Sequence, residues 1–118
     1  MRLTRALCAG VLLLALASPA VAHSLLLESS PAAGSTVAAP AQLMVRFNNR
    51  IEKALSRLRV VDERGEAQRL STPVADGPAD RLTVALPPLA PGAYRVEWQV
   101  LSTDGHIVSG RFSFRVAP

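Results

Sequence analysis

The chain has 118 residues, of which 49% are hydrophobic, and carries 13 basic against 9 acidic side chains. This length supports one domain with one apolar core. The formal charge of +4 includes Arg2 and Arg5 at the start of the chain. Without these two, the charge is near neutral and scattered along the chain, which argues against nucleic acid as a partner.

The first residues have the pattern of a secretory signal peptide. Two arginines precede an apolar run over residues 7–17, and small residues follow it. The run is shorter than the roughly 20 apolar residues that span a bilayer. Ala20-Val21-Ala22 has the A-x-A form at which signal peptidase cuts. We therefore expect residues 1–22 to be removed and residues 23–118 to form the exported domain.

Cysteine usage fits this expectation. Cys8 is the only cysteine, and it would leave with the signal peptide. It precedes the apolar segment, whereas the cysteine of a lipoprotein closes that segment, so we do not expect a lipid anchor. The remaining 96 residues hold 11 basic and 9 acidic side chains and cannot form a disulfide. Such a domain depends on burying apolar surface.

Alternating apolar and polar residues predict short β-strands along the mature chain. The first is broken by Pro31 and Gly34, which confines it to a sheet edge. The last strand, whose alternation is clear over residues 112–116, should begin near Ile107. The predicted strands cover residues 25–28 with 35–37, then 42–47, 58–61, 82–86, 94–100 and 112–116.

About seven short strands and no convincing helix predict an all-β fold. The expected architecture is a Greek-key antiparallel β-sandwich or barrel of immunoglobulin-like or cupredoxin-like kind. Trp98 should lie in its core. Residues 52–59 can form either a helical turn or the approach to a strand, and both alternatives stay open.

The mature chain has two histidines, and the first, His23, would be its amino terminus. A free α-amine and the imidazole of the same residue can chelate one metal ion. The amine, with an ordinary pKa of about 7.7 to 8.0, must lose its proton to coordinate, and Cu(II) competes for such nitrogen donors better than other divalent first-row ions. His23 is therefore a candidate Cu(II) ligand, unless its position is an accident of cleavage.

The second histidine, His106, follows Asp104 and Gly105 between two predicted strands. Its imidazole would complete a T-shaped or square-planar nitrogen set, and Asp104 can add an oxygen. In extended chain Asp104 and His106 project to the same side, while Gly105 also permits a tight turn. Asp-Gly is also a common hairpin turn, after which a histidine is often only solvated. The two histidines together favour one Cu(II) ion per chain.

These residues resemble the CopC/PcoC family of periplasmic copper-binding proteins, and the resemblance covers nearly all of the mature chain. The matching segments are the Ala-His junction at 22 and 23, Ser30-Pro31-Ala32-Ala33-Gly34-Ser35, Leu89-Ala90-Pro91-Gly92-Ala93-Tyr94 leading to Trp98, and Ser102-Thr103-Asp104-Gly105-His106-Ile107-Val108-Ser109-Gly110 with Phe112-Ser113-Phe114. The resemblance implies a periplasmic protein that binds Cu(II) through the amine and imidazole of His23, the imidazole of His106, and Asp104.

The chain departs from the family pattern in two places. Some relatives bind Cu(I) in a methionine-rich segment, whereas the mature chain has only Met44, so we expect no separate Cu(I) site. Asn49 stands where the family often has an acidic residue, which puts a supporting role for that carboxylate in doubt. Glu28 and Glu52 are weak substitutes.

The resemblance implies a non-catalytic carrier that sequesters Cu(II), in resistance or trafficking, and passes it to or buffers it for an inner-membrane transporter of the CopD kind. We expect this carrier to be a monomer, although nothing in the residues excludes a dimer formed through an edge strand. One alternative is a copper-dependent oxidative enzyme, because lytic polysaccharide monooxygenases also use an amino-terminal histidine. A mature chain with one Tyr and one Trp offers little material for an aromatic platform on a polysaccharide. The other alternative is a structural β-sandwich module in which both histidines are incidental.

Overall fold

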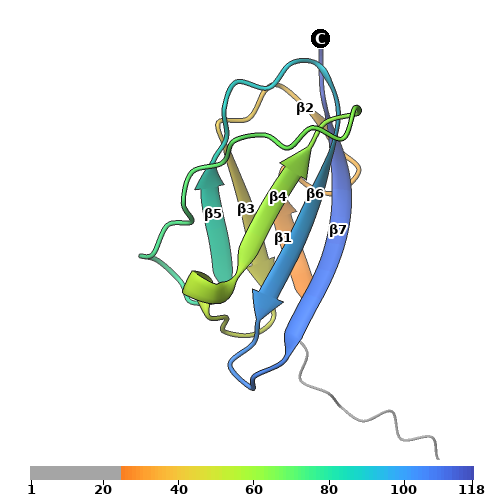
Figure 1. The fold of residues 1–118 in the computed structure, drawn as a ribbon. Helices are drawn as coiled ribbons and strands as arrows, with labels where there is room; N and C mark the ends of the chain where they lie inside the picture. The colour runs from red at the N-terminus through yellow and green to blue at the C-terminus, as the bar shows by residue number, and fades with distance from the viewer. Residues whose placement is uncertain (1–24) are drawn as a thin grey trace, which may run out of the picture.

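The computed structural model describes residues 25–118, which form two β-sheets packed face to face (Figure 1). The all-β prediction is confirmed. The expectations for the signal peptide, Cys8 and His23 fall outside the described residues. The strands are β1 (Leu26–Ser30), β2 (Thr36–Val37), β3 (Gln42–Phe47), β4 (Arg57–Val61), β5 (Arg81–Ala85), β6 (Gly92–Leu101) and β7 (Ile107–Val116). Nowhere in residues 25–118 is a helix long and apolar enough to cross a membrane.

One sheet has the strand order β1-β3-β5 and the other β2-β7-β6-β4. All neighbours are antiparallel except β2 and β7, which pair in parallel and depart from the wholly antiparallel expectation. The cause is the interruption at Pro31 and Gly34. Past it the chain crosses to the other sheet without reversing, so the two-residue β2 runs in the same direction as β7.

The predicted alternation of strand residues builds the core. Inward positions of β3 and β6 are almost fully buried, while the residues between them are half-buried or exposed. Trp98 lies in this core as predicted and meets Phe47 edge to face, with ring centroids 5.1 Å apart. Its indole covers Gly110 of β7, where a Cβ would overlap the ring.

Residues 52–59 contain both of the alternatives predicted for them, first a helical turn and then the approach to a strand. A single 3-10 turn, η1 (Lys53–Leu55), precedes β4. The buried Ser56 joins this turn to the end of β6: its Oγ donates to the carbonyl oxygen of Glu52 at 2.8 Å and accepts from the N–H of Leu101 at 3.2 Å. These bonds fix the end of the sandwich at which β6 turns into β7.

Candidate metal centre

The loop between β6 and β7 has a defined shape. The two strands pair along their whole length up to Leu101 and Ile107, and residues 102–106 make the connection. The N–H of Gly105 donates to the carbonyl oxygen of Ser102, and the N–H of Ser102 donates to that of His106, both at 2.9 Å. Gly105 has φ +90°, which L-residues with a side chain rarely adopt. The shape of the loop therefore depends on this glycine.

Asp104 and His106 lie together in this loop. One carboxylate oxygen, Oδ2, is 3.1 Å from His106 Nδ1, and the other, Oδ1, accepts the N–H of His106 at 3.1 Å. The side chains meet as the sequence led us to expect, but through the turn at Gly105 and not in extended chain. The carboxylate holds both the main chain and the ring of His106, while the imidazole remains 58% exposed.

The start of β1 is fastened at the same end of the sandwich. Asn48 follows β3, and its side-chain oxygen accepts the N–H of Leu25 at 2.6 Å, while its own N–H donates to the carbonyl oxygen of Leu25 at 3.0 Å. Three residues later Ile51 forms a β-bridge with Ser102. The chain from Asn48 to Ile51 therefore connects the start of β1 to the loop that carries His106, and Figure 1 shows both at one end of the two sheets.

The donors at this end include one imidazole and one carboxylate. Within residues 25–118, no group of three or more His, Cys, Asp or Glu side chains is placed to hold a metal ion. The third predicted ligand, His23, lies outside that range. An imidazole whose second nitrogen faces a carboxylate is a common arrangement around metal-binding histidines, so the Asp104 and His106 pair has the chemistry of part of a metal site.

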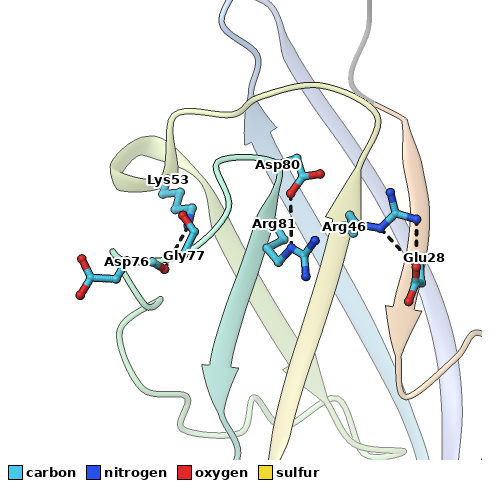
Figure 2. Close-up of polar contacts among 7 residues, drawn as sticks. All are labelled: Glu28, Arg46, Lys53, Asp76, Gly77, Asp80 and Arg81. Carbon is cyan, nitrogen blue, oxygen red and sulfur yellow. Dashed lines mark hydrogen bonds and ion pairs between the residues drawn. The ribbon is translucent and has the colours of Figure 1, made fainter.

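Sequence reasoning passed over Asn48 and considered Asn49. Asn48 is the residue whose side-chain oxygen accepts a hydrogen bond from the N–H of Leu25. A signal was available, because asparagine directly after a strand commonly bonds to main chain in turns. Of the other residues considered, Glu28 forms an ion pair with Arg46 at 2.9 Å (Figure 2), and Met44 is half-buried on the outer side of β3.

Fold and loop define a small two-sheet sandwich that carries an aspartate–histidine pair at one end. Residues 26–117 match the family model of the CopC domain. The chain therefore belongs to the CopC family, as its resemblance suggested.

Several relatives have names that refer to copper. The chain is 33% identical to copper resistance protein C of Escherichia coli over 97% of each chain. Identity to copper resistance protein C of Pseudomonas syringae pv. tomato is 34%, over 92% of this chain and 89% of the relative. Identity to copper transport protein CutJ of Bacillus subtilis (strain 168) is 34% over 80% of this chain, which is 18% of that protein. None of these three has the name of an enzyme.

Solved structures agree with the fold. CopC from Methylosinus trichosporium OB3b superposes with a TM-score of 0.76 at 38% identity, over 81% of this chain and 95% of that chain. PcoC from Escherichia coli, described as a methionine-rich copper resistance protein, superposes with a TM-score of 0.73 at 26% identity, over 80% and 99%.

Proposed function

We propose that this chain is an exported, non-catalytic Cu(II) carrier of the periplasm. Cleavage after Ala22 leaves residues 23–118 as a monomeric mature domain that sequesters copper and delivers it to, or buffers it for, an inner-membrane transporter. Membership of the CopC family supports a copper role, since relatives are named for copper resistance and copper transport. The observation that carries the proposal is the Asp104 and His106 pair beside the anchored start of β1.

The site consists of four donor groups and holds one Cu(II) ion. They are the α-amine and imidazole of His23, the imidazole of His106, and the carboxylate of Asp104. The clamp between Leu25 and Asn48 supports this set, because two residues of extended chain span at most about 7 Å. Over that length of chain the donors of His23 would be able to reach the end of the sandwich that carries the loop.

The geometry of the pair suggests how each residue contributes. Since Nδ1 of His106 faces Asp104, the ring would bind copper through Nε2 while the carboxylate orients the ring. To act as the fourth donor, the carboxylate would have to turn away from Nδ1 toward the ion. Nitrogen and oxygen donors in a tetragonal set suit Cu(II). Binding weakens as the pH falls because protons compete for the amine, whose ordinary pKa is about 7.7 to 8.0.

Exposure of the site fits a carrier. The side chains of His106 and Asp104 are 58% and 35% exposed, so ligands of another protein can reach the ion and displace these donors. The mature chain has a single methionine, Met44, whereas PcoC is methionine-rich. Because Cu(I) prefers thioether sulfur, this scarcity of methionine supports Cu(II) as the cargo. In the copper transport protein CutJ, the region similar to this chain makes up 18% of the protein. A similar region within a transport protein supports a transporter of the CopD kind as the partner.

A competition titration of Cu(II) into mature protein tests this function. We expect one tight site in the unaltered protein, and we expect Asp104→Asn to weaken it by about 10- to 100-fold, the range for residues that support a metal ligand. His106→Ala should weaken it at least as much. Glu66→Gln, which alters an exposed acidic residue in the turn after β4, is the control and should bind normally. Normal binding by folded His106→Ala would refute the proposed ligand set.

A further inference from the structure

The outer side of the sheet formed by β2, β7, β6 and β4 is rich in arginine. Three of its strands contribute exposed arginines at outward positions, and strand register brings them onto one surface. Glu97 is the only acidic residue at the outward positions of these strands. The arginine face is defined here as Arg57, Arg59, Arg95, Arg111 and Arg115.

The net positive charge of this face is larger than the net positive charge of the whole mature domain. Its five arginines and one glutamate amount to four positive charges, whereas residues 25–118 contain 11 basic and 9 acidic side chains in all. The remaining surface therefore has six basic and eight acidic residues. On the opposite sheet the arginines are neutralised one by one, Arg46 by Glu28 at 2.9 Å and Arg81 by Asp80 at 3.3 Å (Figure 2).

The single carboxylate cannot neutralise the arginine face. Glu97 accepts a hydrogen bond from Arg59 at 3.2 Å and lies 3.8 Å from Arg95. Among residues 25–118, no ion pair forms to Arg57, Arg111 or Arg115. Like charges gathered on one surface oppose folding by mutual repulsion, so protein stability does not explain the cluster. An anionic partner would.

A shallow depression of about 520 Å³ opens in the middle of this face. The depression is lined by residues of β4, β6 and β7. Those at outward positions, including Arg57, Arg59 and Arg111, surround it with their side chains. Leu58, Trp98 and Gly110, which lie between these positions along the strands, also line it. Guanidinium groups offer forked donors that match phosphate oxygens, so the depression suits a phosphate group.

We propose that the arginine face docks the mature protein on a membrane surface containing anionic phospholipid, with a lipid phosphate in the depression. This inference rests on the proposed export, which places the protein beside a membrane. An anionic lipid surface attracts clustered arginines through charge alone. The energetic centre of a protein interface instead combines arginine with exposed tryptophan and tyrosine in well-packed pockets. On this sheet Tyr94 and Trp98 are buried, and the large apolar residues at outward positions that are not buried, Leu101 and Ile107, lie at the end beside the metal loop.

Docking in this manner would orient the candidate metal centre. β6 and β7 would lie along the membrane plane, and the loop carrying Asp104 and His106 stands at the end of these two strands. Copper would then be held beside the bilayer that contains the proposed transporter. The face and the metal loop use different residues, so each can be altered without the other.

Flotation with lipid vesicles tests the proposal. The probe is a vesicle of equal parts phosphatidylcholine and phosphatidylglycerol, compared with phosphatidylcholine alone. The triple variant R57Q/R59Q/R111Q removes three charges from the face. The control R46Q/K53Q/R81Q removes three charges that lie away from it, at residues shown in Figure 2. Each arginine near an anionic surface is worth about a five-fold change in binding, so the face variant should bind about 100-fold more weakly. The control should bind almost normally. Added salt should weaken vesicle binding by the unaltered protein and by the control.

Several results would overturn the proposal. They are equal binding to neutral and anionic vesicles, equal losses in the two triple variants, stronger binding to poly-glutamate than to vesicles, or full competition by inorganic phosphate. Circular dichroism checks that both variants fold. Copper titration of the face variant should be normal, so a failure to bind lipid is distinguished from a failure of the proposed copper site.

Discussion

At the scale of single residues, Gly105 sets the shape of the loop that carries the candidate site. The sequence predicted that Asp104 and His106 would meet, and the structure places the carboxylate 3.1 Å from the ring. It could not decide between extended chain and a turn, because Asp-Gly fits both a hairpin loop and a short extended link. The positive φ of Gly105 settles this in favour of the turn.

Gly105→Ala should therefore weaken the loop through its backbone alone. No atom lies within 4 Å of an added Cβ, so the cost is that of holding an L-residue at positive φ, about 1–2 kcal/mol. We expect a lower Tm and weaker Cu(II) binding. Gly65→Ala is a matched control, with φ +82° and equally open space in the turn after β4. It should lower Tm similarly and leave copper affinity intact; equal copper affinities in the two variants would contradict the role of the loop.

At the scale of elements, the period-two pattern predicted the strands well where one side faces the core and the other water. Leu43, Val45 and Phe47 of β3 are buried as expected. The pattern was less informative in the first half of β7. There the apolar residue Ile107 is exposed, and an inward position is taken by Gly110, which lies against the indole of Trp98. The parallel pairing of β2 could not be predicted, since it depends on which sheet edge the chain meets after Pro31.

The clamp at the start of β1 is an element-scale device that substitution can test. Asn48→Ala removes the oxygen that accepts the N–H of Leu25, and loss of one such hydrogen bond costs about 1 kcal/mol. The start of β1 should fray, which hydrogen exchange at Leu25 and Leu26 would detect, and Cu(II) binding should weaken. Asn49→Ala is the comparison; if it lowered copper affinity as much as Asn48→Ala, the clamp would not be the cause.

At the scale of the whole molecule, strand register gathers charge that looks dispersed in the sequence. Arg57, Arg95 and Arg111 are far apart along the chain, so counting charges detected only a small net excess. Register places them on one side of a single sheet. The sequence therefore predicted the core, which follows local alternation, better than the surface, which depends on how distant strands align.

Global stability should depend on pH through Tyr94, at the end of the sandwich opposite the metal loop. Burial, together with the negative charge of Asp62, raises the pKa of its hydroxyl above the usual value near 10, while the hydroxyl donates to the carbonyl oxygen of Ala90 at 2.6 Å. The folded state thus holds this proton more tightly than the unfolded state. The resulting stability is fully present below the ordinary pKa and is lost as pH rises through the raised one.

Tyr94→Phe removes that titrating group and should make the free energy of unfolding less sensitive to pH above about 10. At neutral pH the variant should lose about 1 kcal/mol with the hydrogen bond, since the ring can still stack on Phe114. Urea unfolding at a series of pH values measures both effects. An unchanged alkaline slope would show that Tyr94 does not control it.

The central claim, a Cu(II) site completed by the amino terminus, is tested most directly by electron paramagnetic resonance. Copper is titrated into protein that begins at His23 and into protein with one extra residue before it, which moves the α-amine away from the histidine ring. We predict tight binding of one ion with a nitrogen-rich spectrum in the first, and a weaker site with an altered spectrum in the second. Identical spectra and affinities in both would contradict the account.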